Sequence, residues 1–86
     1  LAPDWIIEIL SPNQSATHVT EKILHAIQHG SQMGWLIDPN EQLILVYAPD
    51  QTPAIAAPTE QIPTPEFTKA IALTPQQIFG WLTLHQ

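Results

Sequence analysis

The chain lacks cysteine and arginine, and it contains only two lysines. Without cysteine, neither a disulfide nor a thiolate metal site can stabilise the fold. Lys22 and Lys69 stand against eight carboxylates, which gives a formal net charge of -6. Nucleic-acid binding draws most of its affinity from lysine and arginine side chains that neutralise phosphates. We therefore expect this acidic chain by itself to bind DNA weakly or not at all.

Long apolar runs and glycine-rich loops are also missing. No apolar run has the length of a membrane-spanning helix, and no basic segment precedes a hydrophobic core as in a signal peptide. The glycines are scattered, so they form no phosphate-binding loop. We expect a soluble, cytoplasmic protein. At 86 residues, the chain should form one small partial domain, residues 1–86, that gains stability by homo-oligomerisation.

The segment 3–12 is almost continuously apolar and has the length of a strand. This pattern is typical of a strand that is buried on both faces of a sheet. Side chains alternate along a strand, so Glu8 looks out between two aliphatic neighbours, Ile6 and Leu10. An ionised carboxylate in such surroundings needs a compensating group. Two explanations stay open: a structural acid paired with Lys22 or with backbone donors, or a ligand of a divalent metal.

Residues 16–29 have the period of a helix, with one apolar stripe formed by Val19, Ile23, Ala26 and Ile27. Ser15 or Thr17 is the expected N-cap, and Gly30 stands where a left-handed C-cap is wanted. Lys22 lies at the edge of the stripe. We therefore expect its ammonium group to reach back toward the end of the first strand.

Two short apolar segments, 33–37 and 42–47, flank the polar turn 38–41, which predicts a hairpin. A strand, a helix and a strand in that order usually form a right-handed parallel crossover. The segment 35–37 should therefore lie parallel to the segment 5–10 in one sheet.

The proline-rich segment 48–65 predicts a loop, and Lys69–Leu73 predicts a last short strand. The sequence Thr74-Pro75-Gln76-Gln77 is typical of a helix start, with threonine as N-cap and the second glutamine returning a bond to it. The helix that follows should pack Ile78, Trp81 and Leu82 onto the sheet. The expected fold is α/β, with a mixed sheet of three or four strands, one crossover helix and a C-terminal helix.

Other candidate sites have simpler explanations. His25 and His29 have the spacing that lets two imidazoles share a metal, but the sequence offers no clear third ligand, so a solvated pair is favoured. Asp38, which precedes a proline, is interpreted as a turn residue. The three tryptophans fall in elements that are predicted to be buried, and we expect all of them in the core: Trp5, Trp35 and Trp81.

An ordered set of sequence blocks resembles a known family. The chain is similar, along essentially its whole length, to the Uma family of putative restriction endonucleases in bacteria, which belongs to the PD-(D/E)XK nuclease superfamily. The blocks that carry the resemblance are Pro3-Asp4-Trp5-Ile6-Ile7-Glu8-Ile9-Leu10-Ser11-Pro12, Glu21-Lys22, Gly34-Trp35-Leu36-Ile37-Asp38-Pro39, Val46-Tyr47-Ala48-Pro49-Asp50, Pro65-Glu66-Phe67 and residues 73–82.

The resemblance implies a restriction-endonuclease-like core in which an aspartate from one strand and a glutamate from the next hold Mg²⁺, which activates water against a phosphodiester of DNA. Glu8 matches that glutamate, as a catalytic residue and metal ligand. The superfamily lysine normally stands two residues later, where this chain has Leu10. Family members often carry it in the following helix instead, and Lys22 matches that place as a catalytic electrostatic stabiliser.

The chain also departs from the family pattern. It begins just before the glutamate strand, so we expect the strand with the metal-binding aspartate to lie outside it, and Asp4 does not replace that aspartate. A tyrosine common one helical turn after the lysine is Ala26 here. We therefore expect the C-terminal part of a Mg²⁺-dependent restriction-endonuclease-like DNA nuclease, catalytically incomplete as this chain. The alternative is a non-catalytic structural or interaction module that dimerises through its sheet.

Overall fold

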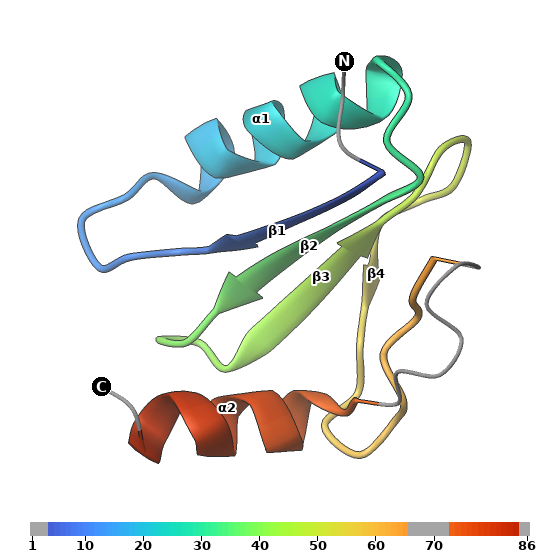
Figure 1. The fold of residues 1–86 in the computed structure, drawn as a ribbon. Coiled ribbons are helices and arrows are strands. Elements are labelled where there is room, and N and C mark those ends of the chain that lie inside the picture. The colour runs from blue at the N-terminus through green and yellow to red at the C-terminus, as the bar shows by residue number, and fades with distance from the viewer. Residues whose placement is uncertain (1–3, 66–72, 85–86) are drawn as a thin grey trace.

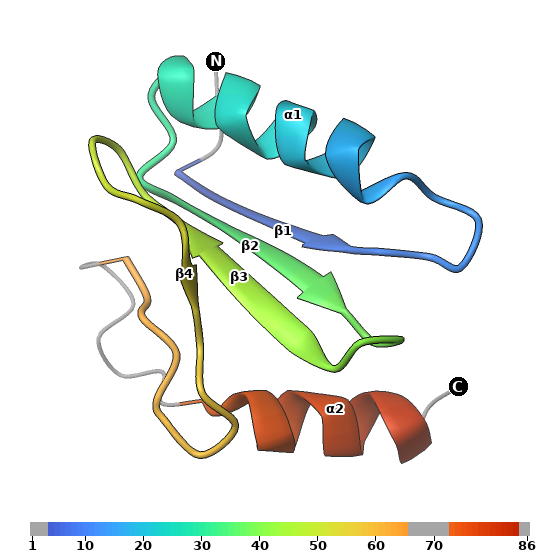
Figure 2. The ribbon, with the colours of Figure 1, turned by 180° about the vertical axis from the view of Figure 1, so that it is seen from behind.

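The computed structural model describes residues 4–65 and 73–84. Its elements follow the order β1 (Trp5–Ile9), α1 (Ala16–Gln28), β2 (Met33–Asp38), β3 (Leu43–Tyr47), β4 (Ala54–Ile55) and α2 (Pro75–Leu84). The four strands form one sheet in the order β1-β2-β3-β4, with β1 parallel to β2 and the other neighbours antiparallel. The helices lie on opposite sides of this sheet (Figures 1 and 2). The predicted α/β class, parallel crossover and hairpin are confirmed.

The crossover helix α1 has local signals at both ends. Ser15 is the N-cap, and its Oγ accepts a hydrogen bond from the backbone N–H of His18 at 3.3 Å. After the helix, Gly30 has a φ of 114°, a left-handed conformation that glycine adopts without steric cost. The predicted stripe faces the sheet, with Val19, Ile23 and Ala26 buried.

The core divides into two clusters because side chains alternate along the strands. On the α1 side, Val19 and Ile23 pack with Leu36 and Tyr47. On the α2 side, the buried cluster contains Trp35, Ile37, Ile44, Val46, Ile62 and Phe79. Gly34 lets α1 approach β2 closely, because a Cβ at that position would collide with Ile23 Cγ2. These contacts fix α1 over the sheet and with it the position of every side chain on the helix.

The start of α2 forms the predicted capping box. Thr74 Oγ1 accepts from the Gln77 backbone N–H at 3.3 Å, and Gln77 Oε1 accepts from the Thr74 N–H at 2.9 Å. The predicted apolar face was wrong at one position. Trp81 is 57% exposed, whereas Phe79 is buried in the core between the partly buried Ile78 and Leu82.

The first strand was expected to be buried on both faces, and this prediction was wrong for the described residues. Ile7 and Ile9 are 45% and 50% exposed. The reason is the position of β1 at the edge of the sheet, while the core contacts of α2 go to side chains of β2 and β3. The face of β1 that carries Ile7 and Ile9 is therefore left open.

A short strand was missed within the segment 48–65. Ala54–Ile55 forms β4, which pairs with β3. The strand predicted at Lys69–Leu73 lies outside the described residues, apart from Leu73. The carbonyl of Leu73 accepts a hydrogen bond from Ile62 N at 2.6 Å, which ties the segment before α2 to the segment after β4.

Candidate functional site

Glu8 lies near the end of β1 on the sheet face that α1 covers. In the strand register it stands beside Leu36 of β2. Its aliphatic neighbours on the same face, Ile6 and Leu10, pack against the cluster beneath α1. The Glu8 side chain is 22% exposed, so its carboxylate sits at the rim of that cluster and still reaches solvent.

Lys22 reaches this carboxylate from the helix. Its Nζ lies 2.6 Å from Glu8 Oε1, and the lysine side chain is 62% exposed. The helix is held in place by the packing of Ile23 against Gly34 and by a hydrogen bond between Thr20 Oγ1 and Tyr47 Oη at 3.3 Å. The predicted approach of Lys22 to the first strand is confirmed. The structure therefore brings together the two residues that the sequence singled out for the site.

This pair by itself does not make a Mg²⁺ site. Mg²⁺ requires near-octahedral coordination by oxygen ligands, often from two carboxylates together with water and substrate phosphates. Within residues 4–65 and 73–84, no group of three or more histidine, aspartate or glutamate side chains could hold a metal ion. Asp4 precedes Glu8 by four residues, about 13 Å along an extended strand. The described residues therefore do not complete such a centre.

Asp38 has a structural task at the same end of the sheet, where β2 leads into the turn to β3. One of its oxygens, Oδ1, accepts hydrogen bonds from the backbone N–H groups of Asn40 and Glu41, each at 3.1 Å. These bonds hold the turn between β2 and β3, as expected for an aspartate at the start of a turn. The interpretation of Asp38 as a residue that stabilises a turn is confirmed.

His25 and His29 lie side by side and exposed at the C-terminal end of α1. Their ring centroids are 4.2 Å apart, and His29 Nδ1 forms a hydrogen bond with the carbonyl oxygen of His25 at 2.8 Å. One ring nitrogen of His29 is therefore engaged in a hydrogen bond at the C-terminal end of α1. The last four carbonyl groups of a helix lack partners within the helix. The pair belongs to no metal-binding group among the described residues.

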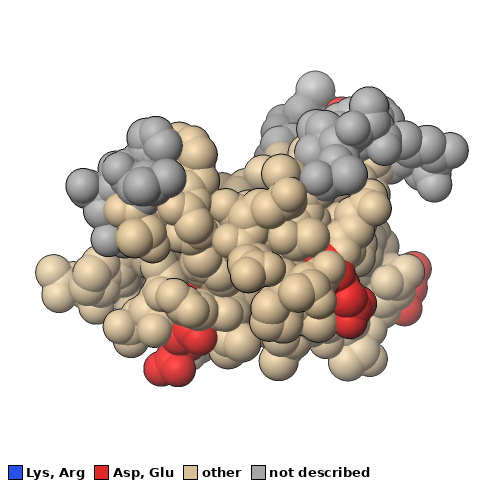
Figure 3. All heavy atoms as spheres, turned by 90° about the horizontal axis from the view of Figure 1, so that it is seen from below, with Lys and Arg blue, Asp and Glu red and all other residues tan. Residues whose placement is uncertain are grey.

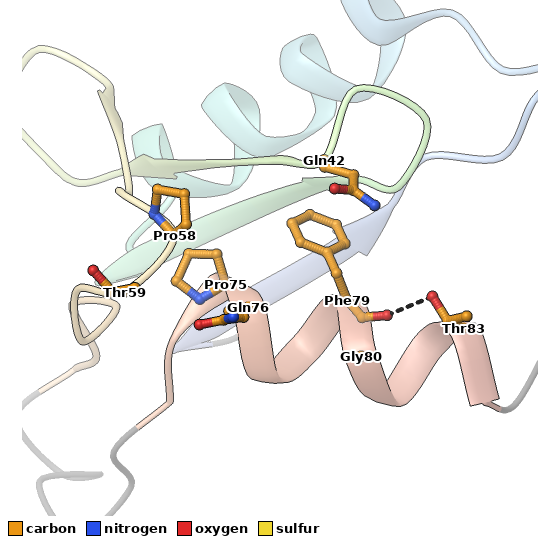
Figure 4. Close-up of a pocket in the computed structure, with 8 residues that line it drawn as sticks. All are labelled: Gln42, Pro58, Thr59, Pro75, Gln76, Phe79, Gly80 and Thr83. Carbon is orange, nitrogen blue, oxygen red and sulfur yellow. Dashed lines mark hydrogen bonds between the residues drawn. The ribbon is translucent and has the colours of Figure 1, made fainter.

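Two grooves lie near α2, and neither is lined by Glu8 or Lys22. The first, of about 420 Å³, has no charged side chain in its lining (Figure 4), which consists of Gln42, Pro58, Thr59, Pro75, Gln76, Phe79, Gly80 and Thr83. The second, of about 710 Å³, lies between the ends of β1 and β2 and Leu82 of α2. No sequence pattern indicates the first groove, because it depends on how α2 approaches the segment after β4.

The distribution of charge separates the two sides of the molecule. On the face seen in Figure 3, aspartate and glutamate side chains appear and no lysine is visible among the described residues. Lys22 belongs to α1, on the opposite side of the sheet from α2. Lys22, the one lysine among the described residues, therefore lies on the α1 side. No helix in the described ranges is long and apolar enough to cross a membrane.

Comparisons with known proteins agree with this arrangement. Four chains of solved structures match this one, and no curated protein does. One of the matching structures is a crystal structure described as a putative nuclease belonging to DUF820 from Anabaena variabilis. It is 51% identical, with a TM-score of 0.92 over 95% of this chain and 46% of its own chain. This chain thus spans about half the length of that relative.

The family follows from the sequence match. The sequence model of the Uma2 family, described as putative restriction endonuclease, matches residues 1–76. The strand β1 with Glu8, the crossover helix α1 with Lys22 and the hairpin of β2 and β3 all fall within this range. The chain therefore belongs to the Uma2 family of putative restriction endonucleases.

Proposed function

We propose that this chain is part of a Mg²⁺-dependent endonuclease that cleaves phosphodiesters in DNA. The observation that supports it best is the contact of 2.6 Å between Lys22 Nζ and Glu8 Oε1. The family resemblance assigns a metal ligand to the position of Glu8 and a displaced lysine to the position of Lys22.

The two residues have different chemical tasks in this proposal. Glu8 would supply one carboxylate of the metal centre, and the remaining protein ligands would come from outside the described residues. When bound, Mg²⁺ supplies an activated water and stabilises charge on the phosphate. Lys22 holds a positive charge beside Glu8 and stabilises the negative charge that develops on the phosphate being attacked. Because the described residues form no group of three or more potential metal ligands, we propose that this chain is catalytically incomplete alone.

The test uses an intact domain that contains this chain together with an upstream aspartate strand. We expect nicking of supercoiled plasmid DNA that requires Mg²⁺. Replacement of Glu8 by glutamine keeps the size of the side chain and removes the charge, so Glu8→Gln should abolish nicking. Lys22→Met keeps the length of the side chain and should lower the rate by roughly 10²- to 10³-fold, the usual cost of losing one electrostatic contact to the transition state.

A charge-matched control separates this role from a general effect of charge. Glu60 is exposed and follows β4, far from Glu8 in the chain, so Glu60→Gln should leave nicking unchanged. If the intact domain shows no Mg²⁺-dependent nicking, or if Glu8→Gln nicks as fast as Glu60→Gln, the proposed activity is overturned. The cytoplasmic location expected from the sequence stays a prediction.

A second proposal, favoured by a different observation, is a non-catalytic role in which the chain associates through its sheet. Ile7 and Ile9 expose half of their surface on an edge strand, where unpaired backbone groups also invite another strand. Sedimentation over a range of concentrations tests it, and a strict monomer would overturn it.

A further inference from the structure

We propose that Tyr47 is a positioning residue for Lys22. Its hydroxyl group holds α1 in the rotation that brings the Lys22 ammonium group to Glu8. The inference rests on the nuclease function proposed above, because the place of this ammonium group bears on a reaction only there. Tyr47 lies buried on β3 and acts through the helix rather than on the substrate.

Polar contacts hold α1 on both sides of β2. The sheet order places β1 and β3 on opposite sides of β2. Toward β3, Thr20 Oγ1 and Tyr47 Oη form a hydrogen bond at 3.3 Å. Toward β1, Lys22 Nζ lies 2.6 Å from Glu8 Oε1. The two contacts therefore lie on opposite flanks of the helix.

Helix geometry links these two flanks. Each residue of an α-helix advances by about 100°, so Thr20 and Lys22 lie about 160° apart around the axis. The buried side chains of Val19 and Ile23 fall between them, against the sheet. If the helix rolled about this stripe by about 20°, a side-chain tip roughly 5–6 Å from the axis would move by about 2 Å. Fewer rotamers of Lys22 would then reach Glu8.

The hydrogen bond restricts such a roll more sharply than the apolar contacts do. Ile23 packs against Gly34, which has no side chain and stands opposite Tyr47 in the register of β2 and β3. Apolar burial is non-directional. A hydrogen bond, in contrast, weakens steeply when its geometry departs from the optimum. The Tyr47 hydroxyl therefore supplies a directional contact beside the point where the helix touches the sheet.

The hydroxyl group can be removed while the ring is kept. The Tyr47 side chain is 6% exposed in the core cluster beneath α1, so phenylalanine fills the same space. Tyr47→Phe removes one partner of the hydrogen bond and Thr20→Val removes the other, whereas Thr20→Ser keeps the hydroxyl group. Thr83→Val is the matched control, because Thr83 Oγ1 donates to Phe79 O at 2.9 Å within α2, on the opposite side of the sheet.

Carbodiimide coupling measures the contact itself in this chain, without reference to activity. The reagent joins a carboxylate and an amine that touch, with loss of water, and peptide mapping by mass spectrometry locates the amide between Lys22 and Glu8. The initial rate of this coupling should fall roughly two- to tenfold in Tyr47→Phe and in Thr20→Val, as the loss of one hydrogen bond implies. Thr20→Ser and Thr83→Val should couple like the wild type. Circular dichroism verifies that each variant folds.

Plasmid nicking by the intact domain measures the consequence for the reaction. Tyr47→Phe should lower the nicking rate by a similar factor, and it should cause no further loss in the Lys22→Met background. An equal loss in both backgrounds would show a merely structural role and overturn the proposal. So would coupling that is as fast in Tyr47→Phe as in the wild type, or equally slow in Thr83→Val. If the intact domain does not nick, the nuclease proposal fails, and the coupling experiment still decides whether Tyr47 positions Lys22.

Discussion

Lys22 and Glu8 meet across 14 residues of sequence, with Nζ and Oε1 2.6 Å apart. The contact joins the crossover helix to the edge strand at the rim of the core. The ammonium group of Lys22 compensates the negative charge of Glu8, an acid that lies within an otherwise apolar strand. A structural ion pair and an incomplete catalytic site both contain this contact, so the contact alone does not distinguish them. Experiments on the pair must therefore measure stability and chemistry separately.

The first prediction concerns the contribution of this pair to stability. We expect a double-mutant cycle of Glu8→Gln and Lys22→Met to give a coupling of about 0.2–1 kcal/mol, because the lysine is mostly exposed. The coupling should fall as NaCl is raised, since salt screens exposed charges. Urea unfolding of the four variants measures it. A coupling indistinguishable from zero at low salt would show that the contact does not contribute to stability in solution.

The second prediction concerns two glycines in different surroundings. Gly34→Ala should destabilise the chain, because the new Cβ would collide with Ile23 Cγ2 and lie 3.2 Å from Ile6 Cγ2. Gly80→Ala should stabilise it by up to about 1 kcal/mol, because Gly80 lies within α2 and a Cβ there meets nothing within 4 Å. Thermal unfolding of both variants measures the difference. Equal effects of the two substitutions would contradict the close approach of α1 to β2.

The third prediction concerns the start of α2. Thr74→Ala removes the oxygen that accepts from Gln77 N and should cost about 1 kcal/mol, within a range of about 0.5–2 kcal/mol. Thr74→Ser keeps the acceptor and should cost little. Circular dichroism during unfolding follows both variants. An alanine variant as stable as the serine variant would mean that the capping box does not hold the helix.

The fourth prediction concerns the segment after β4. Trp35 Nε1 donates to the carbonyl of Pro63 at 3.0 Å, and the indole is 1% exposed. Trp35→Phe leaves that carbonyl without its donor and should cost about 1–3 kcal/mol. Amide exchange in residues 56–62 should become faster. Leu24→Met, at a position of α1 that is 43% exposed, is the control and should change stability by about 0.5 kcal/mol or less.

The fifth prediction concerns the histidine pair. Zn²⁺ should not raise the melting temperature of the chain, because His25 and His29 belong to no group of three or more potential ligands among the described residues, and one nitrogen of His29 already bonds His25 O. Thermal unfolding with and without Zn²⁺ measures this. A rise that disappears in His29→Ala would establish a metal site at this helix end and refute the interpretation as a solvated pair.

The elements whose signals are local could be predicted from the sequence. The left-handed Gly30 and the capping box at Thr74 need contacts within a few residues, so spacing predicted their positions. The N-cap of α1 was predicted as Ser15 or Thr17, and the structure selected Ser15. The parallel pairing of β1 and β2 was predicted from the order strand, helix, strand, which usually forms a parallel crossover. The stripe on α1 also placed Lys22 on the side of the helix that faces the first strand.

Which side chains are buried depended on the tertiary structure. On α2, Trp81 and Phe79 both fit a helical spacing with Ile78 and Leu82, and the position of the helix against β2 and β3 selected Phe79. The two-residue strand β4 has no sequence pattern of its own and exists because β3 offers it an edge. The exposure of Ile7 and Ile9 likewise depends on where α2 lies. Whether a side chain is buried depends on contacts with segments that are far away in the sequence. The periodicity of one segment does not predict those contacts.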